Sequence, residues 1–200
     1  MMTFEEFLPR LERELEGLSA RHRLAFSAAC CQRALPNLRA YAQQTGSIDV
    51  APVRQALEEV WEFIEGTRSV LNVVQLREAC EAQLPPPLDD HVLASAASNT
   101  IQMIDLLLQQ ALDSRAWCSK EIAGWAEASV DGYVQTGPES AEDLQMLPLH
   151  PLMQRELQRQ ELDLESLKSQ NSLHRESLEI LRSRAVSDGG SLDFTPWVVL

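Results

Sequence analysis

The stretch HRLAFSAACCQRALPNLRAYAQQTG, from His22 to Gly46, decides the fold of this chain. Its apolar residues recur at intervals of three and four, which is the spacing of one face of an α-helix. This face consists of Leu24, Ala28, Cys31 and Leu35. Pro36 has no N–H and clashes with the preceding turn, so we expect the helix to stop or kink there. A second helix then runs to Gln44, and Gly46 can supply its left-handed cap.

The residues on either side predict further helices. Thr3 and Glu6 form a capping box, in which the hydroxyl and the carboxylate each bind a free N–H of the first turn. The predicted helices span about 3–18, 20–35, 36–44, 49–64, 72–84, 90–112, 114–134, 140–143 and 150–185. The prolines at 85–87 mark an internal linker. We predict a single all-α domain over residues 1–200, an up-and-down-type bundle of about eight or nine helices with a long C-terminal helix.

The last predicted helix carries a heptad repeat. Its seam consists of His150, Met153, Leu157, Gln160, Leu164, Leu167, Asn171, His174, Leu178, Leu181 and Ala185. A 3.5-residue repeat of this length is typical of coiled-coil packing. Three roles are open to Asn171 and His174: a buried switch that titrates, residues that set register or partner, or residues that face solvent.

Composition and charge narrow the classes of function. The chain has 200 residues, is 44% hydrophobic and contains only eight glycines, which favours helices. The formal charge of −13 is uneven, because residues 1–54 hold seven arginines against six acidic residues and the remainder is strongly acidic. An acidic body repels phosphate, so we do not expect nucleic acid as a partner.

The sequence also predicts where the protein resides. No segment has the pattern of a signal peptide, and none approaches the roughly 20 apolar residues of a membrane span. The four cysteines form no CxxC pair, so we expect reduced thiols in a cytoplasmic protein without a membrane partner. Cys30 and Cys31 fit packing in a core better than a redox or metal pair, since neighbours on a helix point about 100° apart.

Motifs for known catalytic chemistry are missing. A di-iron helical bundle needs Glu-x-x-His pairs, and no histidine follows a glutamate at that spacing. HExxH, GxxxxGK[ST], GxGxxG and GxSxG do not occur either. We therefore predict no catalytic residue, cofactor or metal, and the sequence leaves enzymatic activity undecided.

His22, Arg33 and Asn37 form the candidate polar cluster at the helix break. A break frees backbone groups, and a small anion or carboxylate could be held there by the Arg33 fork and the positive end of the new helix. The alternative is an ordinary corner between helices, with Arg33 paired to a glutamate of a neighbouring helix.

Residues 189–200 form an apolar C-terminal tail after Gly189 and Gly190. With Asn171 and His174, its aromatic residues Phe194 and Trp197 make the candidate interaction surface. The tail could dock on its own bundle or across a dimer, or enter a groove of another protein.

The chain resembles the YjaG-like family, bacterial proteins that contain a domain of unknown function. The resemblance rests on His22, Phe26, Cys31, Arg33, Pro36-Asn37, Gln43-Gln44-Thr45-Gly46 and Trp61-Glu62. It implies an all-helical fold and a cytosolic bacterial protein, and it carries no reaction, cofactor or catalytic residue.

We expect a non-enzymatic protein that acts through protein–protein contacts and self-associates as a homodimer, with a protein partner that the sequence does not identify. The alternative is a protein that binds a small molecule or anion, or an enzyme of unrecognised type, with a site near Arg33, Asn37 and Trp61.

Overall fold

The computed structural model describes residues 3–113, 116–136, 148–187 and 190–192. Within these residues it has eight helices and no strand. The helices are α1 (Phe4–Glu16), α2 (Ala20–Thr45), α3 (Ala51–Glu65), α4 (Val73–Glu81), α5 (Ala94–Leu112), α6 (Ala116–Thr136), α7 (Pro151–Lys168) and α8 (Arg175–Ser187). The predicted all-α class is confirmed. The predicted helix at 140–143 and the tail residues Phe194 and Trp197 lie outside the described residues.

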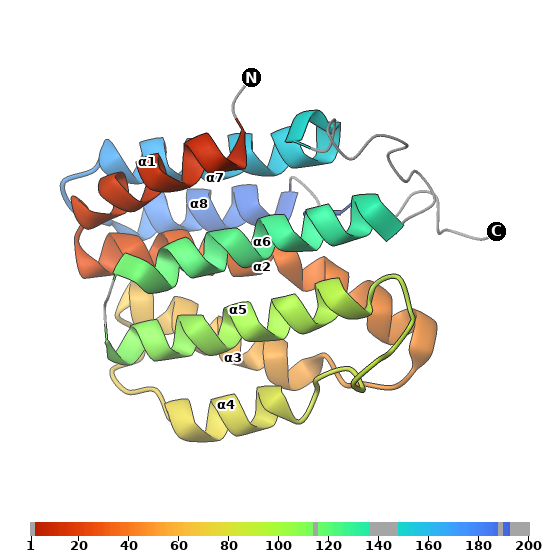
Figure 1. The fold of residues 1–200 in the computed structure, drawn as a ribbon. Coiled ribbons are helices and arrows are strands. Elements are labelled where there is room, and N and C mark those ends of the chain that lie inside the picture. The colour runs from red at the N-terminus through yellow and green to blue at the C-terminus, as the bar shows by residue number, and fades with distance from the viewer. Residues whose placement is uncertain (1–2, 114–115, 137–147, 188–189, 193–200) are drawn as a thin grey trace.

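The long helix α2 is the centre of the bundle. It packs against α3, α5, α6, α7 and α8. In Figure 1, α1, α7 and α8 lie on one side of α2, and α3, α4 and α5 lie on the other. Its small residues at 25, 28–31 and 34 are fully buried, and small side chains allow neighbouring helices to approach closely. One hydrophobic core extends from Phe7 of α1 to Leu192.

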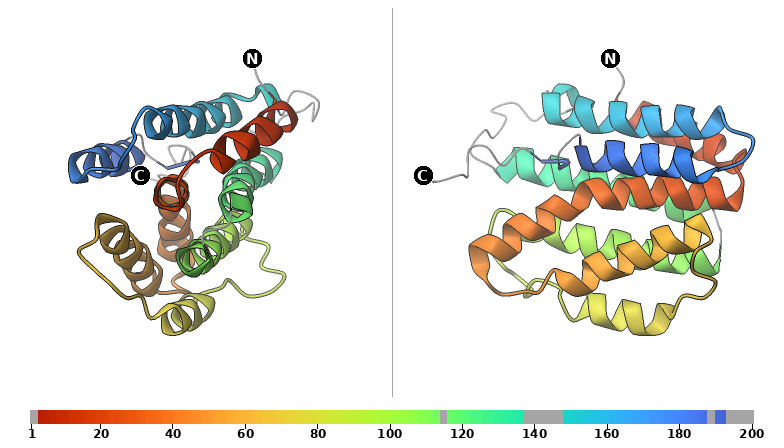
Figure 2. Two further views of the ribbon diagram at one scale, coloured as in Figure 1. Left: turned by 90° about the vertical axis from the view of Figure 1, so that its left-hand side faces the viewer. Right: turned by 180° about the vertical axis from the view of Figure 1, so that it is seen from behind.

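α2 continues through Pro36 as one helix of 26 residues, where the sequence predicted a stop or a kink between two helices. Figure 2 shows the bend in this helix. The proline removes one hydrogen bond and its ring presses on the preceding turn, which bends the helix, while the burial of most of α2 in the core favours continuation. The helix ends at Gly46, whose φ of 65° and N–H bond to the carbonyl of Ala42 confirm the predicted left-handed cap.

The predicted helix at 150–185 is two helices, which corrects the prediction of a single long C-terminal helix. α7 ends at Lys168, α8 begins at Arg175, and Figure 2 shows them as a hairpin. Four polar residues, Ser169 to Ser172, follow α7 directly, and side chains of this kind compete for the backbone hydrogen bonds of a helix. The heptad seam is therefore divided, and both halves bury their leucines in this chain's own core.

The connection between α4 and α5 contains the three prolines. α5 begins at Ala94, later than predicted, because Asp89 and His91 form local turns: Asp89 accepts the His91 N–H and the His91 ring accepts the Leu93 N–H. None of the described helices combines the length and apolarity needed to cross a membrane.

Candidate functional site

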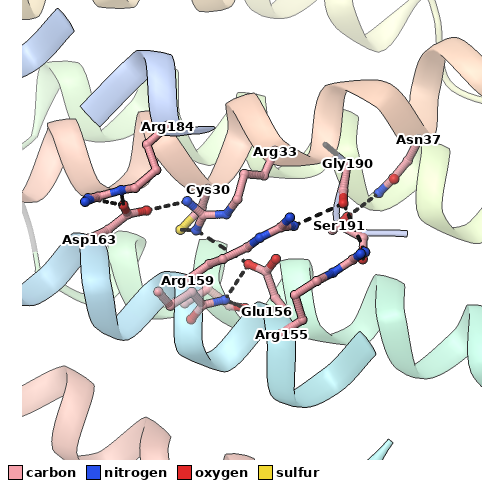
Figure 3. Close-up of polar contacts among 12 residues, drawn as sticks. Cys30, Arg33, Asn37, Arg155, Glu156, Arg159, Asp163, Arg184, Gly190 and Ser191 are labelled. Carbon is pink, nitrogen blue, oxygen red and sulfur yellow. Dashed lines mark hydrogen bonds and ion pairs between the residues drawn. The ribbon is translucent and has the colours of Figure 1, made fainter. Parts of the chain in front are cut away.

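Arg33 lies at the centre of a buried charge network between α2 and α7 (Figure 3). Only 2% of its surface is exposed. One guanidinium nitrogen donates to Asp163, and the other lies 3.5 Å from Glu156 Oε1 and 3.4 Å from the Sγ of Cys30. Both carboxylates are on α7 and are fully buried. The sequence offered a paired arginine as an alternative, and this is the arrangement that the structure has.

Asp163 joins three helices through its two oxygens. Oδ2 accepts from Arg33 of α2, and Oδ1 accepts from Arg184 of α8, whose Nη2 lies 2.6 Å away. Arg184 is partly exposed, so the network extends from the core to the surface along α8. A buried charge that loses its partner typically costs about 3–5 kcal/mol of stability. The network therefore holds α2, α7 and α8 in one arrangement.

The electrostatics of the network act on Arg33 and on the two cysteines beside it. Burial alone would lower the pKa of Arg33, but Glu156, Asp163 and Cys30 together outweigh burial and raise it. Burial raises the pKa of Cys30 to about 12, against the opposing effect of Arg33, and raises that of Cys31 well above its ordinary value. A thiol protonated at neutral pH is a poor nucleophile and metal ligand. Among the described residues, no group of three or more His, Cys, Asp or Glu side chains could hold a metal ion.

Gln160 completes the network on α7. Its Nε2 donates to Glu156 Oε1 at 3.1 Å and to the carbonyl of Ala123 at 3.3 Å. Glu156 Oε2 and Gln160 Oε1 accept no hydrogen bond from a described protein group. Both are buried acceptors, and buried acceptors of this kind normally receive a hydrogen bond from the protein or from ordered water.

The other two members of the predicted cluster lie apart from the Arg33 side chain. His22 is buried near the start of α2, where its ring bonds to the Ser19 hydroxyl at 2.5 Å and to the carbonyl of Gln170 at 3.0 Å. It thereby ties the α7–α8 connection to α2. Asn37 is one turn beyond Arg33, and its Nδ2 donates to the Ser191 hydroxyl at 2.9 Å.

The segment 190–192 lies against the bend in α2 (Figure 3). The Ser191 N–H donates to the carbonyl of Arg33 at 3.1 Å, and Arg155 and Arg159 donate to the carbonyl of Gly190. Leu192 is 3% exposed. The bend at Pro36 explains why a carbonyl of α2 can receive this outside donor. The described beginning of the tail thus docks on its own chain, which was one of the predicted alternatives.

The remaining predicted residues lie elsewhere. Trp61 of α3 is fully buried, and its Nε1 donates to the Gln32 side chain at 3.3 Å on the outer side of the α2 bend. Asn171 and His174 are exposed in the α7–α8 connection. Glu156 and Asp163 were missed as partners of Arg33. In the sequence, the only indication of this role is that each is an acidic residue directly before a seam leucine of α7.

Comparisons with known proteins agree on one family. A sequence model described as "Protein of unknown function (DUF416)" matches residues 10–192. The fold is similar to the crystal structure of a DUF416 family protein from Shewanella baltica OS155, with a TM-score of 0.81 and 21% sequence identity over 90% of this chain and 95% of that one. No curated protein matches the chain.

Proposed function

This chain belongs to the DUF416 family of proteins of unknown function, and we therefore propose a function from its own surface. It acts without catalysis, through contacts with other protein chains, and its first partner is a second copy of itself. The surface that supports this proposal is the edge formed by α4 and the segments that flank it.

The α4 edge is unusually apolar for an exposed surface. The described residues include ten large apolar side chains that are well exposed, and four of them lie between positions 70 and 88: Val70, Val74, Leu84 and Leu88. α4 packs mainly against α3 and α5 and lies at the outer boundary of the bundle (Figure 1). Exposed apolar side chains gathered in this way mark contact surfaces more often than scattered ones do.

The main support for the proposal is the exposure and backbone conformation of Leu88. Its side chain is 98% exposed, and its φ of 63° is a left-handed conformation that costs a leucine about 1–2 kcal/mol. The fold of a single chain gains no stability from an exposed leucine in a strained backbone conformation. A contact that buries this side chain would offset the cost.

The same edge contains a hollow that fits an apolar side chain. It lies between α4 and α5 and has a volume of about 190 Å³. Cys80, Leu84 and Ile101 form its apolar part, and the polar residues Arg77, Glu81, Gln102 and Asp105 line the rest. A protruding leucine and an apolar hollow on one surface make that surface self-complementary. In a dimer with a two-fold axis, each copy can place its Leu88 side chain in the hollow of the other copy.

Light scattering during size-exclusion chromatography tests the proposal. Leu88→Asn removes the apolar side chain and tolerates left-handed backbone, and Gln102→Trp fills the hollow from its exposed rim. We expect the wild type to elute as a dimer and both variants to dissociate at least tenfold more readily. Val186→Ser, an exposed apolar residue of α8, is the matched control and should leave the dimer intact. A wild type that is monomeric at concentrations on the order of 100 μM would contradict the proposal.

The proposal has two further parts. We place the chain with the YjaG-like bacterial proteins of its family, on the residue pattern of positions 22–62. We also propose a cytoplasmic location, which the four buried free cysteines support, since a reducing compartment keeps thiols unpaired.

A further inference from the structure

Two hollows adjoin on the outer side of the α2 bend, and Arg39 lines both. The first has a volume of about 250 Å³, and its walls come from α2, α3 and α8: Gln32, Leu35, Pro36, Arg39, Glu58, Arg182, Ala185 and Val186. The second has a volume of about 240 Å³ and lies at the start of α3, where Arg39 and Arg54 line it together with Asp49, Val50 and Ala51. Both hollows are separate from the α4 edge.

Arg39 and Arg54 differ from nearly all other cations of the protein. In the described residues, every other lysine and arginine except Arg13 bonds to a carboxylate, a carbonyl or another protein group, whereas Arg39 and Arg54 have no such partner. Two of the three unpaired arginines therefore line one hollow. Both are exposed to solvent at this hollow, and neither forms an ion pair although the chain has a net charge of −13.

The two carboxylates that line the hollows, Asp49 and Glu58, form other contacts. Asp49 also lines the second hollow, but its Oδ1 accepts the Ala51 N–H at 2.9 Å, and neither arginine forms an ion pair with it. Glu58 in the first hollow is paired with Arg182, 2.5 Å away. The two arginines thus leave an excess of positive charge.

We propose that these hollows bind a small organic phosphate. Arg39 and Arg54 hold the phosphate group, because guanidinium groups match its oxygens with paired hydrogen bonds. The organic part lies in the first hollow against the apolar atoms of Leu35, Pro36 and Val186. The acidic remainder of the surface repels extended polyanions, so the ligand is a small molecule with a single anionic group.

Calorimetric titration at constant ionic strength tests the assignment, with phenyl phosphate, inorganic phosphate and benzoate as probes. Phenyl phosphate should bind more tightly than inorganic phosphate, because only its ring contacts the apolar atoms of Leu35, Pro36 and Val186 in the first hollow. Benzoate should bind more weakly than phenyl phosphate, because a carboxylate has fewer oxygens for two arginines. Benzoate binding more tightly than phenyl phosphate would overturn the phosphate assignment.

Charge-neutral variants test whether phenyl phosphate binds at this site or at any exposed arginine. Arg39→Gln and Arg54→Gln should each weaken phenyl phosphate binding at least tenfold while the melting temperature of the free protein stays unchanged, since neither side chain holds the fold together. Arg13→Gln removes an equally unpaired arginine from α1 and should leave binding unchanged. Equal losses in all three variants, or no saturable binding at concentrations on the order of 10 mM, would overturn the proposal.

Discussion

The Glu127 side chain of α6 couples the stability of this protein to pH. Partial burial, together with repulsion from Asp131 one helical turn later, raises its pKa from the ordinary 4.5 to about 8. The folded protein therefore holds this proton up to pH 8, whereas the unfolded chain releases it above pH 4.5. The contribution of the Glu127 proton to folding stability is therefore complete below pH 4.5 and is lost as the pH rises towards 8.

Glu127→Gln should remove this pH dependence. The amide cannot ionise, so the variant should match the wild type near pH 5 and be more stable near pH 8.5. We expect a gain of about 1–2 kcal/mol at the higher pH, reduced from the full linkage value because solvent screens a half-exposed group. Thermal unfolding at both pH values measures it, with the exposed Glu121→Gln on the same helix as control. A wild type equally stable at both pH values would contradict the prediction.

The arrangement of α2, α7 and α8 depends on the pairing of Arg33 with Asp163. Asp163→Asn leaves two arginines without their shared carboxylate, one of them fully buried, and should cost about 3–5 kcal/mol of unfolding free energy. Arg184→Gln is the matched comparison. It removes only the partly exposed partner, Arg33 still holds Asp163, and the cost should be about 1 kcal/mol or less.

Urea unfolding of the two variants gives both free energies under the same conditions. If the two substitutions cost the same, the buried pair of Arg33 and Asp163 contributes no more to stability than a surface ion pair does.

The positions of the helices could be predicted from the sequence better than the points at which one helix continues or breaks. Periodic leucines and the Gly46 cap predicted where most elements lie, because those patterns are local. Pro36 predicted a break locally, but α2 continues through it because most of the helix is buried in the core. The break at 169–174 contains neither glycine nor proline, and the heptad spacing continues across it by coincidence.

The candidate site was less predictable for a different reason. Arg33 could be recognised as unusual in an apolar helix, but its partner Asp163 is 130 residues away in the sequence. No local pattern connects the two positions. Likewise, Arg39 and Arg54 resemble any exposed arginines until the structure brings both to one hollow and leaves them without carboxylates.

The charge of the whole molecule determines how two copies can associate. Each chain carries a net charge of −13, so two copies repel each other, and the proposed contact at the α4 edge is mainly apolar. Salt screens the repulsion between the copies, with a Debye length that falls from about 30 Å at 0.01 M to about 8 Å at 0.15 M. Apolar attraction is not weakened by this change.

The dimer should therefore become tighter as salt is added. We expect the dissociation constant measured by sedimentation equilibrium to fall several-fold between 0.01 and 0.3 M NaCl, since screening removes repulsion and leaves the contact of Leu88 with the α4–α5 hollow. Leu88→Asn should remain monomeric across the whole range, because screening alone supplies no attraction. If the wild-type dimer instead weakens with salt, ion pairs hold the two copies together, and the contact lies on a charged surface rather than on the α4 edge.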